Sequence, residues 1–516
     1  MSFFSNDKSI AMKYTPTEQI KNVYIALSCI EMTEGYIPGG RMEKAVIIMC
    51  VAAISVLAVD APGFIMEHGK YSAAYMSDWA NMGTGKAIAK KDIRAVRFSD
   101  VDGMKAKERF EEMPAVYLTN RAVRVSWDVP ADKYKTTMYY IRECKSVVVD
   151  NVYVVQKNAK NAGSHDVFIE DCDVVVVRNS YFAGALSQVH LRIENCGYVF
   201  IDGVEIAGID YEGNGLFRNG IGIFIEGGQM DASGKLYRRY STNARDIQWL
   251  TLQNCYIHDY TFGDTWENKD GIQIHSAPNG ILFNNYIENW DMKYADGAMD
   301  VSHRRTDISD RVLRIERTIV KNCTLTKSPG TGTSDDAIVW VNNIFFNVFH
   351  GDYHHTWRQV FLHNTWIYDT PTANIHYKLW DFTGPAYIIN SLVVASNPIS
   401  MVFQNADQGT EKYRSFHPEN NVYSLSQNAP WLFGVRKESF TFEEWRAQGK
   451  DAGSTLTREG GSAITVNGDV YTIASQTPST VPDDHVRTND VRYRAAHDFF
   501  GKKRSSRPTA GAIEAR

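Results

Sequence analysis

Two segments of this 516-residue chain gather residue types that carry out acid–base and metal chemistry. Asp270 precedes the alternating stretch 271–275, and Asp296 precedes the similar stretch 297–301, which contains Asp300. If both stretches are strands on neighbouring turns of one solenoid, Asp270 and Asp296 begin adjacent strands. Carboxylates stacked about 5 Å apart repel each other strongly unless a cation neutralises them. A calcium ion takes oxygen ligands from such a cluster, so calcium is the first metal to consider here.

Five nearby residues are candidates for binding a carbohydrate. Gln273 and His275 alternate with isoleucines, so both point outward if the isoleucines point into a core. Sugar rings stack their apolar faces on aromatic side chains, although some aromatic residues of this region must fill the core. The predicted binding residues are Gln273, His275, Trp290, His355 and Arg358. The structural alternatives are an exposed strand residue for His275 and a surface loop for the histidine-rich segment 350–358.

The elements that position these residues repeat along the chain. A branched apolar residue, a polar residue and a turn-forming residue, usually asparagine, recur at 149–153, 177–181, 201–205, 252–256, 283–287, 320–324 and 362–366. Spacings of roughly 24 to 30 residues between short alternating runs, stretched where insertions fall, are typical of a stacked β-solenoid. We therefore predict an all-β fold, a right-handed parallel β-helix, whose turn asparagines are left-handed and bond to the turn above. A β-sandwich is the alternative, but its strands do not reuse one phrase in register.

Composition fits a large soluble enzyme or binding protein. The net charge of −5 and the absence of a basic patch interleaved with aromatic residues argue against a nucleic-acid partner. The 7 cysteines include no pair with the CxxC spacing of a metal site. Cys144, Cys172 and Cys196 follow one repeated phrase, and Cys255 and Cys323 follow another. We predict ladders of stacked, buried thiols instead of disulfides or zinc ligands.

The N-terminal part resembles targeting sequence. A charged start at Met42 precedes the apolar run 45–58, which ends near small residues, as in a secretory signal. This run is too short for a comfortable membrane span, so no stable span is expected. We predict a secreted or periplasmic protein with a leader at 1–41, a signal peptide at 42–61, a β-helix with its N-terminal cap at 62–430 and a C-terminal capping segment at 431–516. The alternative is an N-terminal cap that contains a buried apolar helix.

The closing part of the chain resembles a known group of proteins. Phe442-Glu443-Glu444-Trp445 followed by 449–454, and the final segments 498–504 and 508–514, are similar to the ends of secreted β-helix proteins that act on polysaccharides. The resemblance to this pectate-lyase-like superfamily would cover most of the chain after residue 100. It implies a groove on a β-helix and an acidic polysaccharide as the partner.

The acidic segments resemble the calcium site of one family of β-helical pectate lyases, where an Asp-Gly segment and an Asp-rich segment on the next coil hold the ion. The matching positions imply Ca2+ ligands at Asp270, Asp296 and Asp300. The chain departs from the family at two points. The family has two adjacent aspartates where this chain has Asp296 followed by Gly297, and its catalytic lysine lies on the following coil, where 337–340 contains none.

Lyases of this kind cleave a uronic-acid polymer by β-elimination, which removes a proton next to a carboxylate. A base must accept that proton, and a cation must stabilise the developing charge. The nearest candidates by position are Lys269, His303, Arg304 and Arg305. We predict that His303 or Lys269 is the base. One of the two arginines is predicted to clamp the substrate carboxylate, because a planar guanidinium binds it bidentately; a solvated ion-pair loop is the alternative.

We therefore predict a polysaccharide lyase that cleaves a uronic-acid-containing polysaccharide in a groove on the β-helix. The first alternative is a glycoside hydrolase on the same scaffold, with Asp300 and either Asp335 or Asp336 as its carboxylate pair. Asp336 could equally cap the strand that follows it. The second alternative is a non-catalytic adhesin or tailspike-like module that binds polysaccharide. Repeats fit all three, because a fold does not determine a function.

Overall fold

The computed structural model describes residues 92–103, 107–126, 137–157, 165–184, 189–210, 212, 220–227, 247–260, 270–275, 278–290, 297–302, 311–323, 325–327, 336–353, 358–368, 375–380, 386–395, 401–405, 416–426, 433–435, 438–458, 464–467, 470–473, 495–505 and 508–513. The chain divides between Tyr75 and Met76, and all described residues belong to the second part. The predicted leader and signal peptide lie outside the described residues.

One sheet of the solenoid contains 13 strands. They pair in parallel, each with the strand one turn later, except for the antiparallel last pair. In order they are β2 (Glu108–Glu111), β4 (Thr137–Arg142), β6 (His165–Glu170), β9 (Val189–Glu194), β12 (Ile221–Glu226), β15 (Ile272–His275), β18 (Met299–Ser302), β21 (Leu325–Lys327), β24 (Phe349–Tyr353), β27 (Ile375–Trp380), β30 (Met401–Asn405), β33 (Phe433–Val435) and β34 (Glu438–Phe440).

A second sheet of 22 strands consists of two files that are joined through the long strands β3 (Val116–Ser126) and β5 (Ser146–Gln156). The first file continues with β7 (Val174–Arg178), β10 (Tyr198–Asp202), β13 (Trp249–Gln253), β16 (Asn279–Phe283), β19 (Val312–Glu316), β22 (Ala337–Val341), β25 (Arg358–Leu362), β28 (Ala386–Ile389) and β31 (Phe416–Glu419). The second file contains β1 (Ser99–Asp102), β8 (Tyr181–Gly184), β11 (Glu205–Ala207), β14 (Tyr256–Tyr260), β17 (Tyr286–Trp290), β20 (Ile319–Lys321), β23 (Ile344–Phe346), β26 (Thr365–Tyr368), β29 (Leu392–Ala395), β32 (Val422–Leu425) and β35 (Thr455–Thr457). Two further strands, β36 (Ile464–Asn467) and β37 (Val470–Ile473), pair antiparallel by themselves.

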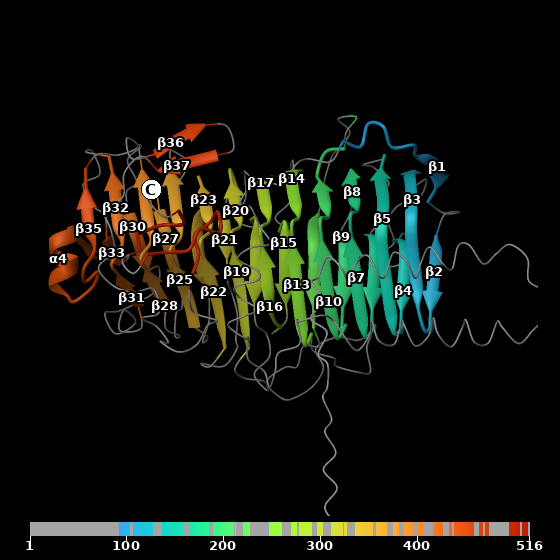
Figure 1. The fold of residues 1–516 in the computed structure, drawn as a ribbon, viewed down its shortest axis with the longest axis horizontal. Coiled ribbons are helices and arrows are strands. Elements are labelled where there is room, and N and C mark those ends of the chain that lie inside the picture. Colours follow the sequence, from blue (N-terminus) through green and yellow to red (C-terminus); the bar gives the residue numbers. More distant parts are fainter. Residues whose placement is uncertain are drawn as a thin grey trace, which may run out of the picture. The chain divides into compact units, whose positions relative to one another are not determined.

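Alternating side chains build the core between these files. In β7, Val175 and Val177 are fully buried, whereas the residues between and beside them are half-buried. One row of inward-facing residues crosses consecutive strands of the 13-stranded sheet. It consists of Val167, Leu191, Ile223, Ile272 and Met299, all completely buried. A single turn cannot bury its inner face alone, so stacking is what removes these side chains from water. The stacked parallel strands in Figure 1 confirm the predicted β-solenoid.

Left-handed residues form the repeated turns, as predicted. Asn151, Asn179, Asn254 and Asn284 all have φ between 50° and 55°. The Asn284 side-chain amide donates to Asn254 Oδ1 at 2.8 Å, and the Asn254 amide donates to Asp202 Oδ1 at 2.7 Å. Asparagine tolerates this backbone region and also satisfies its neighbour along the stack, which explains why the phrase recurs.

Thiols stack at one corner of the first turns. Cys144, Cys172 and Cys196 are buried and free, and the Cys144 backbone N–H donates to Cys172 Sγ at 3.4 Å. The predicted ladder is therefore present for these three residues. The predicted equivalence of Cys255 and Cys323 is wrong, because Cys255 follows a strand of the first file and Cys323 follows β20 of the second.

The C-terminal segment closes the solenoid and then returns along it. Helix α4 (Phe442–Ala447) begins with a capping box between Thr441 and Glu444 and packs Trp445 into the end of the core. Further on, Arg504 donates to Asn342 Oδ1 at 2.7 Å and to the Gly511 carbonyl at 2.9 Å, which fastens residues 495–513 to the turns of the 22-stranded sheet. Within the part of the chain described here, no helix is long and apolar enough to cross a membrane.

Candidate functional site

Three consecutive strands of the 13-stranded sheet form the candidate site. β15 pairs with β18 so that Gln273 lies opposite Asp300, and β18 pairs with β21 so that Asp300 lies opposite Lys327. Neighbouring strands lie about 4.8 Å apart, so these three residues form one row across the three strands. Ile272 and Ile274 belong to the core, which leaves Gln273 on the other face of β15.

Asp270, Gln273, His275 and Asp300 make a connected group, called here the β15–β18 cluster. The Gln273 side-chain amide donates to Asp270 Oδ2 at 3.0 Å and to Asp300 Oδ2 at 3.4 Å. Asp270 Oδ1 accepts the backbone N–H of Gly297 at 3.2 Å, which ties the turn before β18 to the start of β15. One amide thus bridges two carboxylates on neighbouring turns, and two of the three predicted calcium ligands lie together.

His275 lies at the other end of β15 and faces the same cluster. Its Nε2 atom is 3.6 Å from Asp300 Oδ2, and its ring meets the Phe224 ring edge-on with centroids 5.4 Å apart. Glu226 of β12 lies opposite His275 in register. Imidazoles and carboxylates are common general acids and bases, so the cluster contains side chains suited to acid–base chemistry.

The cluster is shielded from water. Asp270 is completely buried, and Gln273, His275 and Asp300 are 2%, 5% and 4% exposed. This burial contradicts the alternative that His275 is an ordinary exposed strand residue. Charges act on each other more strongly in such surroundings than at an open surface, because less solvent screens them.

The described donors fit a calcium site only in part. Calcium prefers about six to eight oxygen ligands. The cluster offers two carboxylates and one side-chain amide, whose nitrogen already faces both carboxylates. Among the residues that the structure describes, no group of three or more His, Cys, Asp or Glu side chains is arranged to hold a metal ion. Asp296, the third predicted ligand, lies outside the described residues.

Trp290 does not line a groove, and its predicted role in carbohydrate binding is wrong. The side chain is fully buried in the core and stacks on Tyr260 with ring centroids 4.6 Å apart. The physical reason is the residue that precedes it. Asn289 has a φ of 51°, so the chain turns before Trp290 and the alternation of β17 no longer predicts which way its ring points.

Arg358 belongs to a different sheet from the cluster. It begins β25 of the 22-stranded sheet, opposite Ala337, and is half-buried. No contact of the described residues brings it to Gln273 or His275. The remaining predicted catalytic and binding residues, Lys269, His303, Arg304, Arg305 and His355, lie outside the described residues, and their roles stay predictions.

Of the carboxylate pair of the hydrolase alternative, Asp300 and Asp336 belong to different sheets. Asp300 lies in β18 of the 13-stranded sheet, whereas Asp336 precedes β22 of the 22-stranded sheet. Asp336 is completely buried and accepts the backbone N–H of Arg311 at 3.0 Å. It therefore ties the start of β22 to the start of the neighbouring strand β19, and Asp335 lies outside the described residues.

Lys327 is the residue of this site that sequence reasoning missed. The segment 337–340 was expected to be the next strand after β18, but it belongs to β22, which pairs with β19 in the other sheet. The true neighbour of β18 is β21, a strand of only three residues that ends in Lys327. A lysine therefore occupies the following coil after all, in the register position of Asp300.

A second polar group, also missed, lies on the second file of the 22-stranded sheet. His258 Nε2 is 3.1 Å from Glu205 Oε1, and His258 Nδ1 is 2.9 Å from Asp259 Oδ2. The Tyr256 ring stacks on the His258 ring with centroids 4.0 Å apart, and the Tyr256 hydroxyl donates to Glu288. Because Glu205 and Glu288 are far from His258 in the sequence, only the register of the strands shows that they meet.

His258 predicts a pH dependence of stability. Burial by itself lowers the pKa of His258, but its hydrogen bonds to Asp259 and Glu205 outweigh burial, and the pKa is raised. A raised pKa in the folded state stabilises the protein fully below the unfolded value of about 6.5, and this contribution is lost as pH rises through the folded value. We expect the urea midpoint to decrease as the pH is raised from 6 to 9. The free energy of unfolding should decrease by roughly 1–3 kcal/mol, the contribution of one charged hydrogen bond.

The control for this prediction is a second histidine. In His258→Gln the decline above neutral pH should disappear, whereas His417→Gln should retain it, because burial lowers the pKa of His417. A decline of equal size in His258→Gln would assign the pH dependence to other groups.

Comparisons with known proteins do not place the chain in a family. No protein-family model matches it. A search of curated proteins likewise finds no relative. The features of the molecule that bear on its function are the solenoid and the β15–β18 cluster.

Proposed function

We propose that this protein is a polysaccharide lyase that cleaves a uronic-acid-containing polysaccharide by β-elimination at the 13-stranded sheet. The observation that supports the proposal is the row of Gln273, Asp300 and Lys327 on three consecutive strands. Asp270 contacts Gln273 in this row, and His275 contacts Asp300. It combines carboxylates, an imidazole and a lysine on one sheet, as removal of a proton beside a carboxylate requires.

The reaction assigns a separate task to each kind of group. A base takes the proton from C5 of the uronate, the electron pair forms the C4=C5 double bond, and the C4–O glycosidic bond breaks as its oxygen gains a proton. Lys327 joins His303 and Lys269 as a candidate base. Arg304 or Arg305 is the proposed clamp on the uronate carboxylate, where its guanidinium would stabilise the negative charge that builds up on the carboxylate oxygens as the enolate develops.

Calcium is part of the proposal, with Asp270, Asp296 and Asp300 as its carboxylate ligands. When bound, a calcium ion would neutralise the stacked carboxylates and polarise the uronate carboxylate. Asp300→Asn is expected to lower the apparent calcium affinity about 10- to 100-fold, as in other sites where a ligating group is disturbed. Calorimetric titration with calcium alone measures this. Equal affinity in Asp300→Asn and the unmodified protein would remove Asp300 from the site.

Ultraviolet absorbance on a panel of polyuronides tests the proposed reaction. Elimination leaves a C4=C5 double bond, which absorbs, whereas hydrolysis leaves none. We expect rising absorbance with at least one of pectate, alginate, glucuronan and the glycosaminoglycans, and loss of the signal with a chelator. New reducing ends without absorbance would identify a hydrolase, and neither signal on any polymer would favour a polysaccharide-binding module.

The proposed partner and location follow from the reaction. An acidic polysaccharide is the substrate, and such polymers lie outside the cytoplasm. The apolar run within 42–61 supports secretion or a periplasmic location, because it has the length of a signal sequence. N-terminal sequencing of secreted protein tests this: an end before residue 42 would contradict it.

A further inference from the structure

Three consecutive turns of the solenoid have the same length and carry a cysteine at the same position. They lead from β4 to β5, from β6 to β7 and from β9 to β10, and the middle residues of these turns are Cys144, Cys172 and Cys196, called here the cysteine ladder. The strands before and after the turns pair in register. The cysteines therefore follow one another at single-strand intervals of about 4.8 Å.

The three turns also share one backbone conformation. Each begins with a left-handed residue whose φ lies between 51° and 57°, namely Glu143, Asp171 and Asn195. The Asp173 N–H donates to the Cys144 carbonyl at 3.1 Å, and the Gly197 N–H donates to the Cys172 carbonyl at 3.0 Å. Successive turns are thus joined at the cysteines themselves, so the backbone fixes the spacing of the ladder.

The three thiols point in the same direction. Each Sγ atom donates to the carbonyl two residues earlier, at 3.1 Å for Cys144 and at 3.2 Å for Cys172 and Cys196. Parallel side chains keep the spacing of the backbone, which places neighbouring sulfur atoms about 4.8 Å apart. A disulfide requires about 2.05 Å between its sulfur atoms, so this arrangement is not that of a pair set for oxidation.

This spacing suits a soft cation held between two thiolates. Metal–thiolate bonds are about 2.3 Å long, so a cation on the line between two sulfur atoms spans about 4.6 Å. Thiolates select soft cations such as Cu(I). Cys144 and Cys196 are two intervals apart and cannot share one ion, which leaves pairs of ligands. Two-coordinate pairs agree with the finding that the described residues contain no group of three or more ligating side chains around one metal position.

Cys172 is the thiol that both pairs share, and its surroundings favour the thiolate. The Cys144 backbone N–H donates to its Sγ atom at 3.4 Å. Hydrogen bonding by Cys196, and after it by Cys144, lowers the pKa of Cys172 even though burial raises it. The thiolate is the form of cysteine that ligates metals, so the middle of the ladder is the best ligand.

The carbonyls that accept the thiols keep another donor. Those of Arg142, Glu170 and Glu194 also accept the backbone N–H groups of Glu112 at 3.0 Å, Glu143 at 3.1 Å and Asp171 at 3.0 Å, respectively. A buried carbonyl that loses its only donor costs free energy. This cost is avoided here when a thiol gives up its proton and turns toward a cation.

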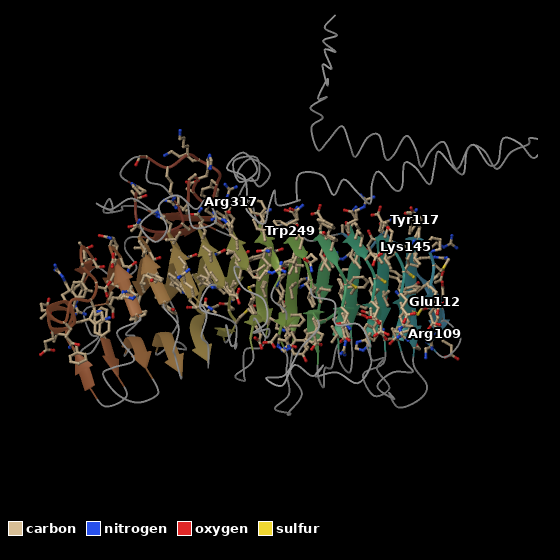
Figure 2. The ribbon with its side chains drawn as sticks, turned by 90° about the horizontal axis from the view of Figure 1, so that it is seen from below. Arg109, Glu112, Tyr117, Lys145, Trp249 and Arg317 are labelled. Atoms are coloured by element: carbon tan, nitrogen blue, oxygen red, sulfur yellow. The ribbon has the colours of Figure 1, made fainter. Side chains whose placement is uncertain are left out.

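We propose that the cysteine ladder binds a soft monovalent cation, Cu(I) or Ag(I), in a linear dithiolate site in which Cys172 pairs with either Cys144 or Cys196. Binding forms two metal–sulfur bonds and displaces the protons of the ligating thiols. The register places Met113 at the equivalent position of the preceding turn, and Met113 is 40% exposed. The sulfur row therefore begins with a thioether residue at the surface, one turn before Cys144 and Lys145, which Figure 2 labels.

Competition with a chromogenic Cu(I) chelator in the presence of ascorbate tests the proposal. Cys172→Ser should lower the Cu(I) affinity at least about 100-fold, because a ligand of both pairs is lost. The two remaining ladder thiols are then about 9.6 Å apart, too far for one cation. Cys144→Ser and Cys196→Ser each keep one complete pair and should stay within about tenfold of the unmodified protein.

Cys255→Ser is the matched control. Cys255 is equally buried and its Sγ atom donates to the Gln253 carbonyl at 3.2 Å, but it lies at another corner of the solenoid. Serine suits such a position, since Ser180 Oγ donates to the Arg178 carbonyl at 2.7 Å in the same way. The control should keep the full Cu(I) affinity. Cu(I) should also raise the thermal midpoint of the unmodified protein and of Cys144→Ser, but not that of Cys172→Ser.

Three outcomes would overturn the proposal. The first is an unmodified protein that cannot compete with the chelator or that binds Cu(I) no better than Cys172→Ser. The second is an equal loss in all three ladder variants, because the pairs would then not share Cys172. The third is a disulfide within the ladder, detected as linked peptides in the unreduced protein.

Discussion

Replacing Lys327 with alanine is expected to lower kcat/KM on the cleaved polysaccharide by about 10²- to 10⁴-fold, the range for loss of a positioned acid–base group. The reason is its place in the register: β21 sets Lys327 opposite Asp300, one strand beyond Gln273. A lysine there can accept the uronate proton or stabilise the charge that follows. The absorbance assay measures the loss, and circular dichroism confirms that the variant is folded.

Two further variants separate this role from a general effect of charge. Lys327→Arg keeps the positive charge, but an arginine side chain is not deprotonated in proteins and cannot act as a base. This variant should therefore show little change in KM and a reduced kcat. Lys145→Ala removes an exposed lysine of the turn before β5, labelled in Figure 2, and should retain full activity. Activity of Lys327→Ala within about threefold of the unmodified protein would exclude Lys327 from the chemistry.

A small amine makes the assignment sharper. If the alanine variant lacks only a base, methylamine added to the assay should restore part of its kcat, because the amine can occupy the space of the missing side chain. A merely structural lysine would not be rescued in this way. Partial rescue in Lys327→Ala without an effect on Lys145→Ala would therefore assign the proton transfer to Lys327.

The fold was predictable because each turn obeys the same local constraints. Asparagine recurs where the backbone must be left-handed, and the side-chain amides then bond along the stack, as Asn284 does to Asn254. Apolar alternation determines which side chains point inward, and these inward-facing residues must line up from turn to turn for the core to close. These are short-range signals, and they repeat often enough to identify a parallel β-solenoid from one sequence.

The candidate site was only partly predictable, because its neighbours are set by register across turns of unequal length. Asp270 and Asp300 could be placed near each other because the alternating stretches 271–275 and 297–301 indicate strands on neighbouring turns. Lys327 was missed because β21 has three residues and little apolar alternation, whereas the strongly apolar β22 resembles the next strand of the site. Trp290 was misplaced because an aromatic side chain suits a sugar-binding groove and a core equally well, and the left-handed turn at Asn289 precedes a ring that lies in the core.

Contacts around Asp451 hold the closing segment 442–454 together. Asp451 is completely buried and accepts four side-chain donors, two of them from within the phrase itself. Trp445 Nε1 donates at 2.8 Å and Ser454 Oγ at 2.7 Å, while Tyr423 Oη donates at 2.9 Å and the Asn421 amide at 3.2 Å from the last full turn. One carboxylate therefore joins α4, the following turn and β32.

Asp451→Ala is expected to destabilise the protein by roughly 3–5 kcal/mol, as when one partner of a buried polar network is removed. Four buried donors lose their acceptor, and alanine is strained at the left-handed position of Asp451, where φ is 51°. Asp451→Asn should cost less, because asparagine tolerates that φ and keeps one oxygen. Urea denaturation measures both variants, with Glu443→Ala on the exposed side of α4 as the control that stays within about 0.5 kcal/mol.

The loss of stability in Asp451→Ala should affect the C-terminal end of the solenoid before it affects the interior turns. In a solenoid each turn contacts only its neighbours, so an unfastened end frays first and the interior turns stay folded. Hydrogen exchange in Asp451→Ala should therefore accelerate in β31, β32 and β35 while β13 and β16 keep their protection. Equal acceleration throughout would mean that the solenoid unfolds as one cooperative unit, and unchanged exchange near α4 would mean that Asp451 does not hold the cap.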